Sequence, residues 1–404
     1  MTELYNVYDS KYLNLCHQSG KFVKIKIELL DWREQAIGEI VTNILNTSGS
    51  INISYQQGTR RTCNLSIVDK QISYLPNENS PFWYNKKFKV YLGLVTGKDI
   101  YYWSQGVFLI QNLSFDNICT LNIEGIDKFG LFDGSLNLSK ADSEYTYLAG
   151  KFTIFNIIQS VLLSDMGNGY ATDYVQPIID FYYLNTMIKS DIILSNGNFV
   201  GETLIEIANL YGADLYYDTD GHLIFHKSVD YVSPNVYKYL APQWYFDENN
   251  SVFLTQSNSY QLDGHNRVYV YTNSSVAKNY SYTAYNTNPS SPINVSAVGI
   301  KSLDDVEIAL ADDVNDDSCR QYGEYLLSKE CRNTVSSDIT CGIIPHLDVN
   351  KTISITNKQL HYNSELFVVN SITLPLGTSD MNINCTNTQC LPDFTCNVTM
   401  GGGI

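Results

Sequence analysis

Residues 49–69, GSINISYQQGTRRTCNLSIVD, carry the pattern that most restricts the fold of this chain. Apolar residues alternate with polar ones from position 51 to 55 and again from 63 to 67, on either side of a Gln57–Gly58 break. Side chains on a β-strand point alternately to its two faces, so the segment predicts two half-buried antiparallel strands joined by a turn. No residue in it is typical of a catalytic site. We therefore interpret the segment as scaffold.

Strand-like segments recur at short spacing in two parts of the chain, about 20–130 and from 253 onward. Such a series, with Gly, Asn or Pro between its members, is typical of β-barrels and sandwiches. We expect the polar stretch 272–297 to be an extended excursion with an edge strand or loop. The predicted strands are FVKIKIELL, SINISY, CNLSIV, FKVYLGLV, DIYYWSQGVFLI and CTLNIEGI, then SVFLTQ, NRVYVY, KTISITN, ELFVVNSITL and MNINCT.

Between these two β units the apolar period becomes helical. Apolar residues at 152, 155, 158 and 162 share one face of segment 151–164, and those at 204, 207, 208 and 211 share a face of segment 201–212. Gly212 is placed to end the second helix. Asp220–Gly221 predicts a hairpin turn between two short strands. The pattern predicts a small α/β module over about 145–235.

The fold class that follows is mainly β with a small α/β insert. One helix interrupts the second β unit, where Ser318-x-x-Gln321 fits a capping box and Tyr322 and Leu326 share a face. We divide the chain into a first β-barrel (1–140), the α/β module (141–240), a second β-barrel with one helix (241–390) and a flexible C-terminal tail (391–404). The comparable length of the two β units suggests a duplication.

Composition restricts the possible partners. A length of 404 residues suggests about three domains. The 31 tyrosines suit surfaces that are partly apolar and partly wet, as in broad protein–protein contacts, although AT-rich codon usage explains them equally well. The net charge is −16, and Arg60–Arg61 and Lys86–Lys87 are the only basic clusters. This argues against tight or specific nucleic-acid binding but is compatible with an acidic wall past which DNA slides.

The chain shows no targeting signal and no metal-binding cysteine pattern. The N-terminus MTELYNVYDSKYLNL lacks a basic region followed by an apolar core, and no apolar run approaches the roughly 20 residues of a membrane helix. We expect synthesis in a cytoplasm without stable membrane insertion. The nine cysteines form no CxxC pair, so we expect reduced core residues. Cys385, Cys390 and Cys396 fit no zinc spacing well.

Candidate sites that the sequence offers are each better explained by structure. His222 and His226 lie four apart on a predicted strand, about 13 Å from each other and too far for one metal ion. Asp218-Thr219-Asp220-Gly221 resembles an aspartic-protease loop, but has no second copy and suits a turn.

Two further sets of acidic residues also lack a catalytic or metal-binding pattern. Asp313, Asn315, Asp317 and Glu324 match calcium-loop positions, but Ser318 replaces the required glycine. Asp304–Asp305 and Asp316–Asp317 are expected to be solvated. We predict no catalytic residue, cofactor or metal site.

Several segments together resemble the baseplate or tail-tip hub proteins of long-tailed bacteriophages, whose fold recurs in contractile injection machines. The resemblance covers about 20–385 and rests on the order and spacing of the segments. They are GSINISYQQGTRRTCNLSI, NENSPFWYNKKFKVYLGL, WSQGVFLI, NIEGIDKFGLFDG, ETLIEIANLYGADLYYDTDGHLIF, HNRVYVY, EYLLSKE, PHLDVNKTISI and ITLPLGTSDMNINC. The chain departs from the family where Asn350–Lys351 stands in place of an expected Gly-Asp.

The resemblance implies a non-enzymatic homotrimer whose two tube-like β domains per copy form a pseudo-sixfold ring in the virion tail tip. The implied partners are the tail tube or distal tail protein, the tape measure protein and a threefold spike or fibre, with DNA passing through the lumen. Many relatives continue into a peptidoglycan-cleaving domain, whereas this sequence stops at Ile404, so we expect wall cleavage to reside in another protein.

Two alternative functions remain open. One is a phage-associated peptidoglycan or glycan hydrolase, although no carboxylate pair is singled out. The other is a carbohydrate-binding tail module in which Tyr101, Tyr102 and Trp103 stack on sugars; a strand with one aromatic face in an interface explains these residues more simply. Arg60–Arg61, just after the turn, is interpreted as an exposed pair available for a ring or tube contact.

Overall fold

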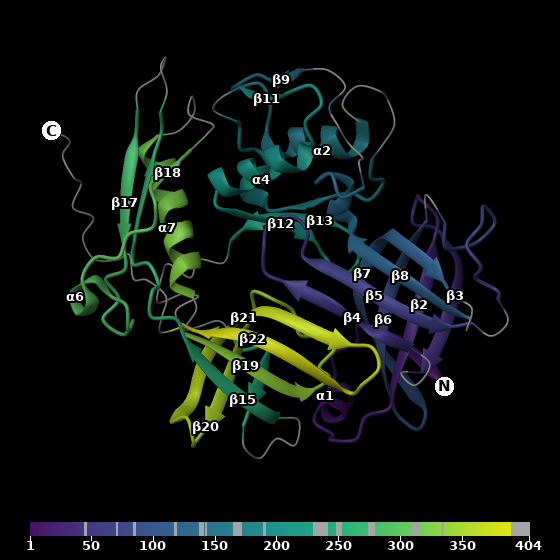
Figure 1. Ribbon diagram of the computed structural model, residues 1–404. Coiled ribbons are helices and arrows are strands. Elements are labelled where there is room, and N and C mark those ends of the chain that lie inside the picture. Colours follow the sequence, from purple (N-terminus) through teal and green to yellow (C-terminus); the bar gives the residue numbers. More distant parts are fainter. Residues whose placement is uncertain are drawn as a thin grey trace.

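The computed structural model of the protein describes most of residues 1–388. Its description excludes 44–46, 70–71, 84–85, 117–118, 137–140, 142–143, 165–171, 189–190, 229–240, 248–252, 274–278, 309–314, 333–334 and 389–404. The predicted tail at 391–404 therefore lies outside the described residues. Figure 1 shows the long sheet in the lower part of the molecule, the α/β module above it, and a smaller sheet with a long helix to the left.

All six strands predicted for the first β unit are confirmed. The sequence pattern does not predict β1 or β3, because their side chains are largely exposed and show no clear apolar alternation. The elements are β1 (Thr2–Tyr5), α1 (Ser10–Cys16), β2 (Val23–Leu30), β3 (Ala36–Asn43), β4 (Thr47–Ser54), β5 (Arg61–Val68), β6 (Lys87–Val95), β7 (Asp99–Phe115), β8 (Thr120–Asp127) and the short 3₁₀ helix η2 (Lys128–Leu131).

The α/β module has the predicted helices and hairpin. Gly212 follows α4 with φ 60° and Gly221 lies in the hairpin turn with φ 87°, both in the left-handed region that favours glycine. In α2 the buried face is formed by Ile154, Ile157, Ile158, Val161 and Leu162, so Phe152 precedes the helix instead of joining its apolar face. The elements are β9 (Tyr145–Tyr147), α2 (Ile154–Ser164), β10 (Ile178–Ile179), α3 (Phe181–Leu184), β11 (Ile192–Leu194), α4 (Val200–Leu210), β12 (Ala213–Tyr217) and β13 (Leu223–Lys227).

The last part of the chain contributes to two separate sheets. The predicted edge strand within 272–297 is confirmed as β17, at the edge of a three-stranded sheet against which α7 packs. The elements are β14 (Trp244–Phe246), β15 (Phe253–Tyr260), β16 (Arg267–Tyr271), β17 (Ser281–Tyr285), α6 (Val295–Val298), β18 (Val306–Glu307), α7 (Asp316–Arg332), β19 (Val335–Gly342), β20 (Thr352–Asn357), β21 (Tyr362–Pro375) and β22 (Asp380–Asn387).

The predicted capping box at Ser318 is wrong. Helix α7 begins at Asp316, and the side chain of Asn315 accepts a hydrogen bond from the Ser318 backbone N–H at 3.0 Å. Asn315 therefore caps the helix, because its amide oxygen reaches the third residue beyond it, as N-cap side chains do.

One long sheet contains strands of both β units, which confirms a mainly β fold. Its main path runs β15-β19-β22-β21-β4-β5-β8-β7-β6-β2-β3. Strand β21 pairs antiparallel with β4, with Thr373 opposite Asn52 and Leu374 opposite Ile51. The inward side chains of both units form a single apolar core, in which Ile51 and Ile53 are buried in the same cluster as Ile372 and Leu374.

The β4–β5 turn docks onto the α/β module. The Gly58 backbone N–H donates to the Leu215 carbonyl at 2.8 Å, and the Gln57 side chain bonds both the Ala213 carbonyl and the Leu215 N–H. Gly58 has φ 78°, and a Cβ atom there would lie 2.8 Å from the Phe129 ring. The turn predicted at Gln57–Gly58 is thus both confirmed and used as the attachment of the module.

We expect Gly58→Ala to destabilise the protein by roughly 1–3 kcal/mol, because it combines an unfavourable φ with a steric clash. A lower midpoint in thermal denaturation would show this. Gly97→Ala is the matched control, since nothing lies within 4 Å of the added methyl group. Equal midpoints for the two variants would contradict the docking role of Gly58.

Candidate functional site

The candidate functional surface is one face of eight neighbouring strands of the long sheet, in the order β15-β19-β22-β21-β4-β5-β8-β7. In-register pairing places alternate residues of neighbouring strands on this side, away from the core. We call it the polar face. Its exposed or half-buried polar members are Thr255, Ser257, Ser259, Ser336, Asp338, Thr340, Asp380, Asn382, Asn384, Ser371, Thr373, Ser48, Ser50, Asn52, Ser54, Thr62, Asn64, Ser66, Thr120, Asn122, Glu124, Asn112 and Ser114, and Val68 and Pro375 are also on it.

Side-chain hydrogen bonds between neighbouring strands order this face. Ser66 Oγ lies 2.6 Å from Asn122 Oδ1, and Thr373 Oγ1 donates to Asn52 Oδ1 at 3.2 Å across the junction of the two β units. Cross-strand pairs of this kind stabilise a sheet modestly and fix its register. Two further pairs are Thr340 with Asn382 and Asn384 with Asp338.

Hydroxyl and amide groups dominate the polar face, and its charges are acidic. Glu124, Asp338 and Asp380 are its ionisable members, and none of the described positions on it is a lysine or arginine. Proteins bind nucleic acid largely by placing cationic side chains against phosphates. A face of this composition is well hydrated and, among its described positions, offers no cationic side chain to bind the phosphates of a nucleic acid.

The interpretation of Arg60–Arg61 as an exposed pair is wrong, because both side chains are buried. The Arg61 guanidinium donates to the Tyr217 carbonyl at 2.8 Å and to both oxygens of Asp348 at 2.8 and 2.7 Å. The Arg60 guanidinium lies 3.5 Å from the centroid of the Tyr216 ring. The pair therefore holds the first β unit, the β12–β13 hairpin and the loop after β19 together.

Asp127 anchors the backbone of the same pair. Its carboxylate accepts hydrogen bonds from the backbone N–H groups of Arg60 at 2.7 Å, Arg61 at 2.9 Å and Phe129 at 3.1 Å. Burial raises the pKa of the Asp127 carboxyl to about 6, although the three N–H donors oppose that rise.

Asn350, the departure from the expected Gly-Asp, also joins this junction. It adopts φ 58°. Its side-chain amide donates to Asp214 at 3.1 Å, which links the loop after β19 to the β12–β13 hairpin. Asparagine tolerates the left-handed region better than most residues, so the turn is kept without glycine.

A second buried charge cluster lies beside the first. Lys87 Nζ contacts Glu34 at 2.8 Å, and Lys128 contacts both Glu34 and Asp173, the latter at 2.9 Å. The Tyr217 hydroxyl donates to Asp173 at 2.8 Å. Burial, and then repulsion from Lys128, lower the pKa of the Lys87 ammonium group. Lys87 is thus a structural residue at the base of the module.

The sugar-stacking hypothesis for Tyr101 and Tyr102 is wrong, because both rings are buried within the protein. Tyr101 packs against Tyr12 of α1, and Tyr102 stacks on Tyr5 of β1 with ring centroids 5.6 Å apart. Trp103 is partly buried and lies 5.2 Å from the Tyr12 ring. Helix α1 therefore covers Tyr101 on one side of β7, and Tyr5 of β1 covers Tyr102 on the other side.

Four aromatic rings surround His346 in the loop after β19. Tyr8, Tyr12, Trp103 and Trp244 have ring centroids between 5.1 and 5.7 Å from that of His346. His346 Nδ1 lies 2.8 Å from the Tyr12 hydroxyl, within hydrogen-bond distance. Burial lowers the pKa of His346 to about 4. The cluster fixes α1 between the two β units.

The structure does not bring the histidines or the calcium-loop residues together as a metal site. His222 contacts Asp218, and His226 lies beside Tyr216. Glu324 on α7 accepts a hydrogen bond from the Tyr282 hydroxyl of β17, while Asp313 lies outside the described residues. In the part of the chain that is described, no group of three His, Cys, Asp or Glu residues is arranged to bind a metal.

The acidic pairs and the described cysteines differ in exposure. Asp304–Asp305 and Asp316–Asp317 are exposed, as expected. Of the seven described cysteines, all but Cys119 are buried, as expected of core residues. Cys390 and Cys396 lie outside the described residues. Among the described helices, none is long and apolar enough to cross a membrane.

We expect Arg61→Met to destabilise the protein by about 3 kcal/mol, because it leaves Asp348 and the Tyr217 carbonyl without their buried donor. Urea denaturation followed by tryptophan fluorescence measures this. Arg267→Met is the control, since the side chain of Arg267 bonds Ser302 at an exposed position. A variant as stable as the wild type would refute the assigned role of Arg61.

We expect His346 to make stability fall as the pH is lowered. Its pKa is about 4 when folded and 6.5 when unfolded, so the unfolded chain binds more protons between these values. The stability that neutral His346 contributes is fully present above pH 6.5 and is lost as the pH falls from 6.5 through 4. It amounts to roughly 3 kcal/mol. Denaturation at pH 7 and pH 4 should show a smaller decrease for His346→Gln than for wild type. His361→Asn, at an exposed position, should resemble the wild type, and identical pH dependence in all three proteins would exclude this role.

No protein-family model matches the chain, and no curated protein matches it. Solved structures do match over nearly its whole length. The tail protein from Neisseria meningitidis MC58 has a TM-score of 0.56 at 11% identity, covering 90% of this chain and 96% of that one. The 43 kDa tail protein of prophage MuSo2 from Shewanella oneidensis has a TM-score of 0.55 at 11% identity, covering 92% and 100%.

A third match is a chain of the half-lidded Francisella PdpA–VgrG complex. Its TM-score is 0.53 at 9% identity, and the alignment covers 96% of this chain and 62% of that one. These proteins and this chain thus share an overall fold. The resemblance predicted from the sequence is confirmed in the fold: this chain has the fold of phage and prophage tail proteins.

Proposed function

We propose that the protein is a structural subunit of a phage-type tail, a trimeric hub whose polar face lines a central channel. The observation that carries this proposal is the continuity of that face across both β units. Residues 48–66 and 371–384 lie far apart in the sequence, yet their strands pair directly and present one surface of hydroxyl and amide groups. The match to tail proteins over nine-tenths of the chain supports it.

The dimensions of the polar face suit a ring of three copies. Each copy contributes eight strands, so three copies bring together 24 strands. At about 4.8 Å between strands and a tilt of about 40°, a closed barrel of this size has a backbone diameter of roughly 48 Å. Side chains narrow that opening but leave room for a DNA duplex.

The chemistry of the polar face suits passage better than binding. Neutral hydroxyl and amide groups keep a layer of water, and the acidic members repel phosphates. Without lysine or arginine on its described positions, counterion release supplies no affinity. A duplex moving through such a channel would meet no strong binding site.

The two β units of each copy explain how a trimer would fit its neighbours. Three copies present six β units, which suits a sixfold tail tube or distal tail protein on one side, while the threefold axis suits a spike or fibre on the other. The tape measure protein and the genome would occupy the lumen. In this proposal the protein acts at the tail tip of the virion, after synthesis in the bacterial cytoplasm, and is not an enzyme.

The proposal predicts a threefold ring with a central opening in electron micrographs of the purified protein. Asn64→Cys labelled with maleimide-gold should place gold at the opening, because Asn64 is exposed on the polar face. Phe22→Cys is the matched control and should place gold outside the opening, since Phe22 lies off that face and is 81% exposed.

Two results would contradict the proposal. A protein that stays monomeric at every concentration, alone and with tail tube protein, would rule out the hub. Gold at the outer rim for Asn64→Cys would rule out the polar face as the channel lining.

A further inference from the structure

We infer that the ring closes by strand pairing between β15 of one copy and the last five residues of β7, 111–115, of the next. The inference rests on the proposed trimer and names the surfaces that join its copies. A second copy of this chain occupies both surfaces.

Both strands have one unpaired side among the described residues. Strand β15 pairs with β19 alone and ends the sheet on that side. Strand β7 is longer than its neighbour β6, whose pairing ends where Lys87 faces Leu109. Beyond that point, residues 112–115 pair with β8 alone. An open edge presents unpaired backbone groups and readily adds another strand.

The strand directions make the two edges compatible. Seven successive antiparallel pairings separate β15 from β7, so the two strands run in opposite directions. A rotation about a ring axis preserves both directions, and β15 of one copy therefore meets β7 of the next as an antiparallel partner. The polar faces of all copies then point to the same side. Such a head-to-tail contact closes into a ring when the rotation fits.

A groove beside the free part of β7 supplies apolar contacts for the incoming strand. It encloses ≈ 730 Å³ and is lined by Trp32, Trp83, Lys86 and Leu113, among others. Leu113 points away from the polar face, since its neighbours Asn112 and Ser114 point toward it. The groove therefore lies on the outer side of the ring, where an apolar side chain of the next copy would be sheltered from water.

The end of β15 offers matching side chains. Tyr260 is 63% exposed and Leu262 is 82% exposed. Tyr260 lies on the side of β15 opposite Ser257 and Ser259, which is also the side that faces the groove in the paired arrangement. Asp263 follows Leu262 and is opposite in charge to Lys86.

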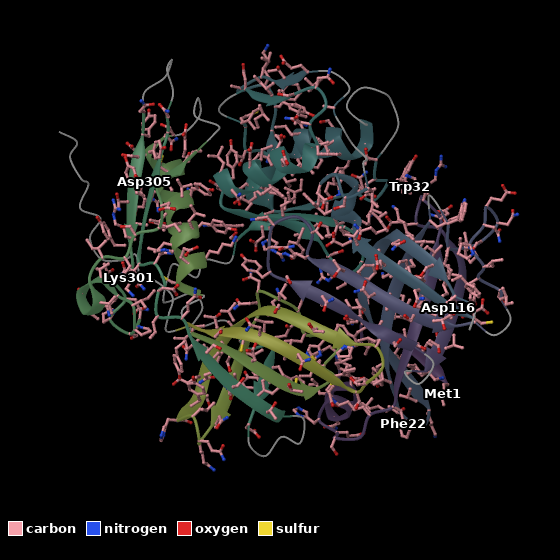
Figure 2. The ribbon with its side chains drawn as sticks, viewed as in Figure 1. Met1, Phe22, Trp32, Asp116, Lys301 and Asp305 are labelled. Carbon is pink, nitrogen blue, oxygen red and sulfur yellow. The ribbon has the colours of Figure 1, made fainter. Side chains whose placement is uncertain are left out.

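The two edges lie at opposite ends of the molecule, as a ring requires. The Lys301 ammonium group donates to the Leu262 carbonyl at 2.5 Å, which places Lys301 near the end of β15. Figure 2 shows Lys301 on the left of the molecule and Trp32, beside the groove, on the right. A single copy cannot join these surfaces to each other. A separate peptide would cover one edge and leave the other open, whereas a second copy covers both.

The first test compares two double variants by light scattering and mass photometry. Tyr260→Asp/Leu262→Asp should assemble at least tenfold more weakly than wild type while keeping its melting temperature. Phe181→Asp/Tyr182→Asp is the matched control, because these residues are also exposed, at 82% and 68%, but belong to α3 of the α/β module and to neither strand. It should assemble as the wild type does.

The second test distinguishes a head-to-tail contact from a symmetric one. Tyr260→Cys and Gln111→Cys proteins, one of them carrying a larger tag, are mixed and treated with a short bismaleimide. The crosslinked product should contain one copy of each and exceed that from either variant alone, with wild type setting the background from native cysteines. Equal self-crosslinking of a single variant would overturn the inference.

The outcomes separate this inference from the proposed function. If wild type forms a trimer and the Tyr260→Asp/Leu262→Asp protein forms it equally well, the inference fails and the hub stands. If wild type never assembles, both fail.

Discussion

The pairing of β21 with β4 is the contact on which the rest of the structure depends. It joins strands separated by more than three hundred residues into one sheet, with Thr373 opposite Asn52. Because a strand has two faces, this one pairing creates both the shared apolar core behind the sheet and the continuous polar face in front of it. Without it the two β units would be separate, and neither would present a surface eight strands wide.

Buried charges keep the α/β module in place at the end of this sheet. Arg61 reaches the β12–β13 hairpin through Tyr217 and the loop after β19 through Asp348. A buried ion pair adds little net stability compared with apolar packing, but it strongly penalises arrangements in which one partner is left alone. The module can therefore sit in few orientations other than the one seen. A fixed orientation of the module suits the proposed hub, in which neighbouring subunits must contact each copy at fixed angles.

The sequence reveals strands and helices because their patterns are local, but it does not reveal which charges are buried. The Arg60–Arg61 pair resembles a solvated surface pair, since its carboxylate partners Asp127 and Asp348 lie 66 and 287 positions from Arg61. Tyr102 looks available for the same reason, because β1, which covers it, lies far away in the sequence. The polar residues of each strand are also visible in the sequence. Their alignment across eight strands depends on register, which no single segment specifies.

The proposed ring accounts for the polar face and the open edges together. A long sheet with an exposed edge invites aggregation, and monomeric proteins commonly protect such an edge with charge, proline or a covering loop. Strand β15 instead carries Thr255, Ser257 and Ser259 on one face and ends with the exposed Tyr260. None of these side chains is a charged residue or a proline that would hinder another strand from pairing with this edge. An edge left unprotected in this way is explained if a second copy covers it, and in a closed ring every copy covers these two edges of its neighbours.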